Sequence, residues 1–414
     1  MAGALLLYNF GRLRSGAVIK GVVVLLAVSA SVAVFAVAAP LRPKPALATS
    51  CGEISDYAPA WSPDGRFVAF TRVRGSGGDS GVFRIGPDGR HQRRISAAGD
   101  YAYGAVWSPD GKRVAYATFD LAAVVRIVVA RADGTAAHIV ATFQGEREPP
   151  TTFLSWSPNG AWVAYVDSPG DLLVADASGG GEQRLIAHGA TQPAWSPEGS
   201  QIAYVAANGI TISDPGGGNP RTIAQGAFPA WSPDSRRIAY TSVPGVGVHV
   251  IGADGSADRL VDPSGSFPQW TPDGDALVDV SPSGRQHGAV HVVRLASARV
   301  RTVSHDASHM FGSDDSAASI TPNRKTIVFS STPVVGGSEI RLVHRDGRAE
   351  HRLSYHCAIV DEGAGGHVYG TWLGDIVRAR NNLHDTITCG AGYDIADADR
   401  RDRVARDCET VRRS

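Results

Sequence analysis

The sequence predicts an all-β chain whose main body is a β-propeller of about seven four-stranded blades, or six if the last repeat unit serves only as closure. Two observations lead to this prediction. A turn motif, preceded by tryptophan in six of its seven copies, recurs at steps of 36 to 50 residues, and each interval contains patterns typical of four short strands. We also expect an apolar helix at the N-terminal end and a short β-roll-like repeat at the C-terminal end.

Residues 1–48 are predicted to be a signal peptide or a signal anchor. Basic residues precede an uncharged apolar run of 19 residues, at positions 21–39. That run is near the ~20 residues that cross a bilayer as a helix, and it is longer than the ~7–15 usual in a cleaved signal. We keep two fates open, a cleaved leader and a membrane anchor formed by residues 21–39. Either fate predicts an extracytoplasmic chain, secreted or anchored to the cell membrane.

Each repeat unit begins with a short strand, a Ser-Pro-Asp-Gly-type turn and a second strand that alternates or runs apolar. The units are PAWSPDGRFVAF from Pro59, AVWSPDGKRVAY from Ala105, LSWSPNGAWVAY from Leu154, PAWSPEGSQIAY from Pro193, PAWSPDSRRIAY from Pro229, PQWTPDGDALVD from Pro268 and SITPNRKTIVFS from Ser319. In the turn, Pro presets φ and Gly tolerates the tight exit, so the pair of strands is predicted to be a hairpin.

Two further strands complete each unit. Third strands close on a Gly-containing turn, as in VHVIGADG from Val248, and fourth strands are short and charged, as in RRIS from Arg93. Charged short edges discourage edge-to-edge pairing. The turn aspartates are interpreted as turn residues rather than as a carboxylate ring, and the tryptophans as packing between blades rather than as a sugar platform. The aspartates in question are Asp64, Asp110, Asp234 and Asp273.

The consensus of these units, xPAWSPDGxxIAY…IYVxxxDGxxxRLT, resembles that of the TolB-like, WD-like propeller family over about residues 51 to 356. The predicted propeller domain spans residues 51–358. The resemblance implies protein partners in the cell envelope, although a fold does not fix a function.

The four cysteines form two natural pairs. Cys51 precedes the first unit and Cys357 follows the last strand, so a closed ring would make them neighbours. We predict a Cys51–Cys357 disulfide, with two free thiols as the alternative, and a second disulfide between Cys389 and Cys408. An even cysteine count favours export over a thiol or zinc role.

After a Gly-rich linker, residues 359–374, a shorter periodicity occupies residues 375–414. Asp375, Asp385, Asp394 and Asp402 recur at steps of 10, 9 and 8, each two residues before an apolar side chain. The best unit, CGAGYD from Cys389, resembles the RTX-type, haemolysin-like calcium-binding repeats.

The RTX resemblance implies calcium held by Asp385, Gly390, Gly392 and Asp394. The match departs from the family pattern, because Cys389 replaces the first Gly and Ala396 replaces a large apolar residue. The alternative is a purely structural, cysteine-stapled repeat without calcium.

The composition and motifs point away from catalysis and from nucleic acid. Lys+Arg and Asp+Glu both number 40, so no global field favours nucleic acid. The sequence has no G-x-S-x-G elbow, phosphate-binding loop, H-E-x-x-H helix or C-x-x-C pair. No catalytic or cofactor-binding residue is predicted, and no cofactor beyond the calcium considered above.

Two functions follow from this reading. The first is an exported, non-catalytic scaffold that binds a protein, peptide or glycan partner in the cell envelope. The second is a metal-dependent lyase or hydrolase with a site at the propeller channel, for which the candidate ligands are the His305–His309 segment and nearby Asp314 and Asp315. Three or more converging His, Asp or Glu side chains at a channel mouth would favour the enzyme, and a Gly, Ser and apolar mouth would favour binding.

Overall fold

The computed structural model describes most of the predicted propeller and parts of the C-terminal repeat. The described residues run from 54 to 354, without 75–79, 100, 146–152, 169, 208, 243–246, 282–287, 308–317 and 332–337; beyond them they are 358–360, 367–369, 376–379, 384, 386–388, 395–406 and 410–413. Within these ranges the secondary structure is strand, turn and loop.

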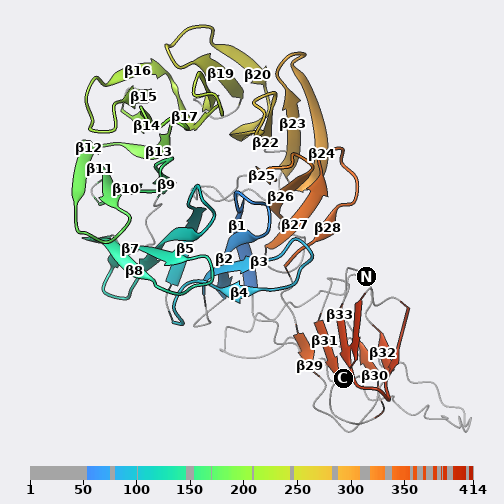
Figure 1. The fold of residues 1–414 in the computed structure, drawn as a ribbon. Coiled ribbons are helices and arrows are strands. Elements are labelled where there is room, and N and C mark those ends of the chain that lie inside the picture. Colours follow the sequence, from blue (N-terminus) through green and yellow to red (C-terminus); the bar gives the residue numbers. More distant parts are fainter. Residues whose placement is uncertain are drawn as a thin grey trace, which may run out of the picture. The chain divides into compact units, whose positions relative to one another are not determined.

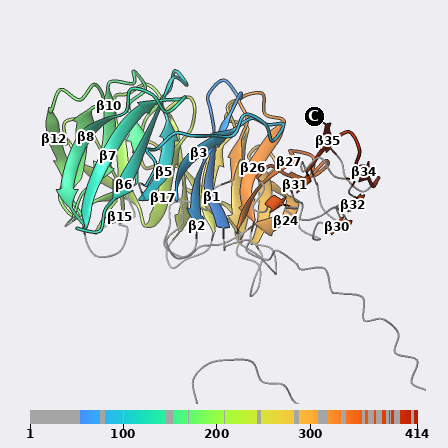
Figure 2. The ribbon, with the colours of Figure 1, turned by 90° about the horizontal axis from the view of Figure 1, so that it is seen from below.

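Seven antiparallel sheets of four strands each surround a common centre (Figure 1). In every sheet the strands follow one another in chain order, so each blade is built from one continuous stretch of sequence. Figure 2 shows the blades edge-on, with their strands running from one face of the ring to the other. Seven blades, rather than six, form the ring, because the unit from Ser319 makes a complete four-stranded sheet.

The first four blades take up the chain from residue 54 to residue 224. Their strands are β1 (Ile54–Trp61), β2 (Val68–Arg74), β3 (Gly81–Ile85) and β4 (Arg93–Arg94); β5 (Tyr101–Trp107), β6 (Arg113–Phe119), β7 (Val124–Arg131) and β8 (His138–Gln144); β9 (Ser155–Trp156), β10 (Trp162–Val166), β11 (Leu172–Asp176) and β12 (Gln183–Ala187); β13 (Thr191–Trp195), β14 (Ile202–Ala206), β15 (Gly209–Ser213) and β16 (Arg221–Ala224).

The remaining three blades end at residue 352. Their strands are β17 (Gly226–Trp231), β18 (Arg237–Ser242), β19 (Val248–Gly252) and β20 (Arg259–Asp262); β21 (Ser266–Trp270), β22 (Ala276–Ser281), β23 (Gly288–Arg294) and β24 (Arg299–Ala307); β25 (Ser319–Ile320), β26 (Thr326–Ser331), β27 (Glu339–His344) and β28 (His351–Arg352). Most fourth strands are short, as predicted, but β8 and β24 are longer than the charged edge pattern indicated.

The turn aspartates have the role that the sequence indicates. In the first blade Asp64 Oδ1 accepts the Ser62 hydroxyl at 2.6 Å and the Arg66 amide at 3.0 Å, while the Gly65 amide donates to the Ser62 carbonyl at 2.8 Å. The same serine or threonine to acid or amide bond recurs in blades 2, 3, 5, 6 and 7, whereas in blade 4 Glu198 accepts the Ser200 hydroxyl instead. These carboxylates therefore close hairpins and do not converge.

Apolar packing between neighbouring blades forms the core. Clusters of buried side chains join every adjacent pair, including the last blade and the first, where Trp61 and Phe70 pack with Val328 and Ile340. The Asp56 amide also donates to the Ser338 carbonyl across that seam at 2.7 Å. The ring is thus closed by packing and isolated hydrogen bonds, because the first and last sheets share no strand.

The C-terminal repeat consists of two parallel sheets, as its short periodicity predicted. One sheet contains β29 (Ala358–Val360), β31 (Ile376–Ala379), β33 (Ile395–Ala398) and β35 (Thr410–Arg413), and the other contains β30 (His367–Tyr369), β32 (Thr386–Thr388) and β34 (Arg403–Val404). Successive strands alternate between the sheets, which is the arrangement of a β-roll. Ile387 and Ala396 are fully buried, as expected for the apolar position of each unit.

Several predictions concern residues outside the described part of the chain. These are the apolar helix at 21–39, all four cysteines with their two disulfides, and the calcium residues Asp385, Gly390, Gly392 and Asp394. Among the residues that are described, none belongs to a helix long and apolar enough to cross a membrane.

Candidate functional site

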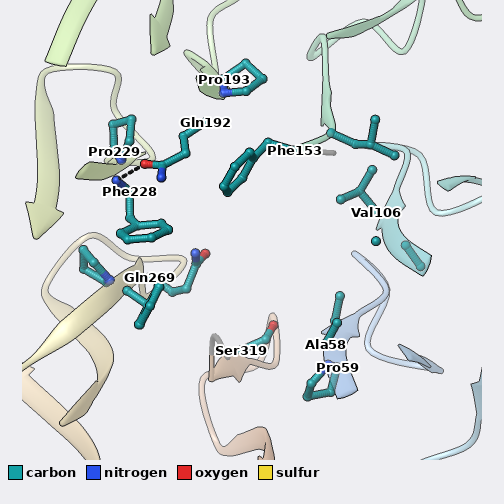
Figure 3. Close-up of a pocket in the computed structure, with 16 residues that line it drawn as sticks. Ala58, Pro59, Val106, Phe153, Gln192, Pro193, Phe228, Pro229, Gln269 and Ser319 are labelled. Atoms are coloured by element: carbon teal, nitrogen blue, oxygen red, sulfur yellow. Dashed lines mark hydrogen bonds between the residues drawn. The ribbon is translucent and has the colours of Figure 1, made fainter. Parts of the chain in front are cut away.

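A cavity of about 290 Å³ occupies the centre of the ring (Figure 3). All seven blades contribute to its wall through their innermost strands or the residues just before them. The lining residues are Ala58, Pro59, Ala60, Gly104, Ala105, Val106, Phe153, Leu154, Gln192, Pro193, Phe228, Pro229, Phe267, Pro268, Gln269 and Ser319. We call this cavity the central channel.

A repeated backbone irregularity presents one residue of each of five blades to the channel. The residue three positions before the blade tryptophan has a positive φ in five blades: Ala58 (54°), Gly104 (66°), Gln192 (55°), Phe228 (55°) and Phe267 (57°). In all five the pairing of the first two strands shifts register at this point. Such a β-bulge re-aims a side chain, and positive φ is uncommon for a bulky residue such as phenylalanine.

Three phenylalanines from three blades meet in the channel. The ring centroids of Phe228 and Phe267 lie 4.3 Å apart, and those of Phe153 and Phe228 lie 6.4 Å apart, with tilted planes in both pairs. The side-chain oxygen of Gln192 accepts the Phe228 amide, which fixes the bulge of one blade against its neighbour (Figure 3). Phe228 on β17 and Phe267 on β21 are therefore presented by strands, and Phe153 lies just before β9.

The described lining of the channel carries no ionisable side chain. Its polar side chains are those of Gln192, Gln269 and Ser319, which offer neutral hydrogen-bond donors and acceptors. An apolar wall with a few neutral polar groups binds apolar side chains and orients them. Neither a general acid or base nor a charged metal ligand is present on this wall as described.

A second cluster lies between blades 5 and 6, outside the channel lining. Asp262 ends β20 of the fifth blade, whereas Asp279 on β22 and His291 on β23 belong to the sixth. His291 Nδ1 lies 2.7 Å from Asp262 Oδ2 and 3.5 Å from Asp279 Oδ1, and the three residues are 0%, 0% and 7% exposed for Asp262, Asp279 and His291. Asp262 also accepts the amide and the hydroxyl of Ser264.

Burial and charge shift all three groups of this cluster. Burial raises the pKa of Asp279 to about 6. Burial alone would lower the pKa of His291, but the hydrogen bond to Asp262 and the nearby Asp279 carboxylate outweigh it and raise the pKa to about 9. Burial likewise acts to raise the pKa of Asp262, yet the bonds from His291 and Ser264 lower it overall.

The sequence-predicted metal candidates lie outside the side chains that the structure describes. His305 and Asp306 fall within β24, but their side chains lie outside the described residues, as do His309, Asp314 and Asp315. Sequence reasoning also missed both sites described above. The signal for the channel was the residue just before each Pro-Ala-Trp sequence. The signal for the buried cluster was the final Asp of PQWTPDGDALVD, because the other units end in an aromatic residue or in phenylalanine and serine.

Sequence comparisons relate the propeller to TolB. Residues 21–199 match the model of the TolB beta propeller domain. A 45-residue stretch is 42% identical to the Tol-Pal system protein TolB 1 of Novosphingobium aromaticivorans, and it covers 11% of this chain and 10% of that relative.

Solved structures show the same fold at low identity. An oligogalacturonate lyase in complex with manganese is 15% identical, with a TM-score of 0.56, over 70% of this chain and 90% of the lyase. The β-propeller domain of the Trilobed protease from Pyrococcus furiosus is 12% identical, with a TM-score of 0.55, over 73% of this chain and 99% of that domain, and is described as having an open velcro topology. These solved structures show that the ring has the β-propeller fold, and the sequence match relates residues 21–199 to the TolB beta propeller domain.

Proposed function

We propose that this chain is an exported, non-catalytic propeller scaffold that binds a protein partner of the cell envelope in its central channel. The observation that carries the proposal is the set of bulged, positive-φ residues from five blades, which line an uncharged and largely apolar channel. Strained backbone of this kind persists where the surrounding structure over-determines it, and it is concentrated at binding sites. The match to the TolB domain, and to a protein of the Tol-Pal system, supports an envelope partner outside the cytoplasm.

The size and chemistry of the channel indicate what part of a partner it takes. About 290 Å³ lies just below the roughly 300–1,000 Å³ usual for small-molecule pockets, so the channel suits one or two apolar side chains of a peptide segment. Tilted rings such as Phe228 and Phe267 offer both faces and edges to an incoming aromatic or aliphatic side chain. The neighbouring glutamines can hydrogen-bond the backbone of that segment.

The alternative, a metal-dependent lyase or hydrolase acting at the channel, rests on fold alone. The lyase of similar structure holds manganese, but its identity of 15% carries the fold and not the activity. Such an enzyme would need several acidic or imidazole groups at a channel mouth. The apolar character of the described wall supports binding instead.

The proposal is tested by recovering partners from envelope extract with the channel intact and altered. Phe228→Ala and Phe267→Ala place in these blades the residue type that blade 1 already carries at Ala58, with the same positive φ. Leu121→Ala is the matched control, because Leu121 is 98% exposed in the β6–β7 connection, outside the channel lining.

The wild-type chain and the Leu121 variant should retain the same protein, and the double phenylalanine variant should lose it while melting at a similar temperature. Retention by the double variant would contradict the channel as the binding site. Recovery of a glycan in place of a protein would contradict the partner class, and turnover of a polyuronate with added Mn²⁺ would favour the enzyme.

Two accessory features are part of this proposal. We infer that residues 21–39 direct export, as a leader or an anchor, which mass measurement of the mature chain decides. We also propose that the C-terminal roll binds calcium through Asp385, Gly390, Gly392 and Asp394. Its parallel two-sheet architecture supports this, and Ca²⁺-dependent protection of the roll from proteolysis, lost in Asp394→Asn, is the test.

A further inference from the structure

Blade 6 differs from every other blade at one core position. Nine residues after the tryptophan, or its equivalent Ile320, the other six blades carry a buried aromatic side chain that packs toward the preceding blade. These residues are Phe70, Tyr116, Tyr165, Tyr204, Tyr240 and Phe329. In blade 6 the position is taken by Asp279, which is fully buried. A carboxylate replaces an aromatic ring in an interface that is otherwise apolar.

The surroundings of Asp279 are adapted to it. The preceding blade ends in Asp262 rather than the serine found at the ends of β4 and β28, and His291 lies opposite Asp279 in the strand pairing. A Cβ atom on Gly265 would lie 2.7 Å from the Asp279 carboxyl group, so a larger residue there would displace that carboxyl group. Four residues of blades 5 and 6 therefore shape one enclosed polar site.

One of the two carboxylates in this site makes no hydrogen bond within the described part of the chain, and its nearest cation, the His291 imidazole, lies 3.5 Å away. His291 donates to Asp262 at 2.7 Å, but both carboxylate oxygens of Asp279 lack a hydrogen-bond partner among the described residues. A buried carboxylate without hydrogen bonds is costly, and a bound cation is one of the ways in which proteins offset that cost. One candidate nitrogen and two candidate oxygens from Asp262, Asp279 and His291 all lie within 4.8 Å of one another.

We propose that Asp262, Asp279 and His291 bind a divalent transition-metal ion, of which Zn²⁺ is the best fit. One imidazole nitrogen and two carboxylate oxygens form a ligand set that suits this class of ion. Bonds of about 2.1 Å in a tetrahedral site place ligand atoms roughly 3.4 Å apart, so only small side-chain movements are needed. A water molecule would occupy the fourth coordination position of the metal ion.

The role of this ion is structural. The site is enclosed between blades 5 and 6, and the chain passes directly from Asp262 through Gly265 to Phe267 on the channel wall. A metal there would clamp the two blades and hold the bulge that presents Phe267. The proposal does not depend on the channel having a partner.

The test measures metal content and metal-dependent stability of the full chain. The protein is stripped with EDTA, desalted, offered Zn²⁺ or Mn²⁺, and examined by elemental analysis and thermal melting. Asp279→Asn keeps the shape of the side chain and removes the charge. His249→Gln is the matched control, because His249 occupies in blade 5 the strand position that His291 occupies in blade 6. His249 lies opposite Tyr240 and pairs with Asp258 at 3.2 Å.

We expect the wild-type chain and the His249 variant to bind one more equivalent of Zn²⁺ than Asp279→Asn, and to melt several degrees higher with the metal than without it. Asp279→Tyr, which restores the aromatic residue of the other blades, should melt at a temperature independent of metal. Equal Zn²⁺ retention and equal thermal shifts in wild-type and Asp279→Asn would overturn the proposal and assign the metal to other groups. Absence of any metal-dependent shift in the wild-type chain would show that the His291 proton alone balances the cluster.

Discussion

The turn after each first strand depends on one residue in the left-handed region of the backbone. Gly111 has a φ of 67° in blade 2, and its nearest neighbour for an added Cβ is Pro63 at 3.6 Å, so space is not the constraint there. Blades 5 and 7 instead tolerate Ser235 and Arg324 at this place, with φ of 59° and 63°. The turn therefore imposes a conformational cost wherever glycine is absent.

Gly111→Ala should lower the free energy of unfolding by about 1–2 kcal/mol, because alanine must adopt the left-handed conformation there. Gly216→Ala is the control, since Gly216 has no positive φ and open space around it. That variant should be neutral or slightly stabilising. Urea unfolding of both variants checks the difference, and equal destabilisation would contradict the conformational explanation.

The free energy of unfolding at acid pH should depend on turn carboxylates such as Asp273. Burial tends to raise its pKa, but the Thr271 hydroxyl, the Arg324 guanidinium and the Asp275 amide together lower it to about 2. A lowered pKa in the folded state gives stability that is present above the unfolded value near 4 and is lost as the pH falls toward 2.

Asp273→Asn should thus reduce stability at pH 7 by no more than about 1 kcal/mol, because the ion pair with Arg324 is partly exposed. The gap from wild type should shrink between pH 4 and pH 2. Asn323 shows that asparagine preserves the turn, since it accepts the Thr321 hydroxyl at 2.6 Å in blade 7. A gap that stays constant with pH would exclude the charge as its cause.

At the scale of the strand, most blade tryptophans make a side-chain hydrogen bond as well as packing contacts. The indole of Trp107 donates to the Ala60 carbonyl of the preceding blade at 3.0 Å, and equivalent bonds are made in blades 3, 5 and 6. Trp61 and Trp195 lack such a partner among the described residues. In both cases the preceding blade carries a serine just before its own tryptophan or the equivalent residue. The hydroxyl of that serine accepts a hydrogen bond from the backbone amide of Trp61 or Trp195 instead.

Trp107→Phe should therefore cost about 1 kcal/mol more stability than Trp195→Phe. Both variants remove the indole nitrogen, but Trp107 is buried whereas Trp195 is partly buried, and only the first variant leaves a carbonyl without its donor. Chemical denaturation of the two variants side by side measures the difference. Similar losses would mean that packing, not hydrogen bonding, accounts for the contribution of the blade tryptophans to stability.

The blades themselves could be predicted because their signals are local. A tryptophan, a Ser-Pro-Asp-Gly turn and an apolar run are contiguous in the sequence, and the same hydrogen bonds follow wherever they recur. Ser319 begins a full blade although its unit lacks both tryptophan and glycine, because Thr321 and Asn323 preserve the turn.

The channel and the buried triad could not be predicted in the same way. Phe228 reaches the channel through a bulge, and a bulge depends on strand register rather than on the residue itself. Asp262 and His291 are 29 positions apart and meet only because two blades stack. Long-range packing, not local pattern, creates both sites.

At the scale of the whole molecule, closure of the ring rests on the contact between the last and first blades. Since no strand is shared there, the Trp61–Val328 packing and the Asp56–Ser338 bond bring the ends together. A covalent tie between Cys51 and Cys357 would add to this contact by restricting the unfolded chain.

Non-reducing digestion should recover a peptide that links Cys51 to Cys357, and a second that links Cys389 to Cys408. Reduction should lower the stability by about 2–4 kcal/mol, with ~5 kcal/mol as the upper figure for so long a loop. Recovery of Cys51 linked to Cys389 would contradict the placement of the cysteines at the seam.

The central claim is that this protein binds its partner in the central channel and not on its outer surface. Its most direct measurement places a photo-reactive phenylalanine analogue at Phe228, and separately at Leu121, and maps crosslinks in the cell envelope by mass spectrometry. We predict crosslinks from position 228 to one segment of one envelope protein, and none to that protein from position 121. Crosslinks to the same protein from position 121 alone would contradict the account.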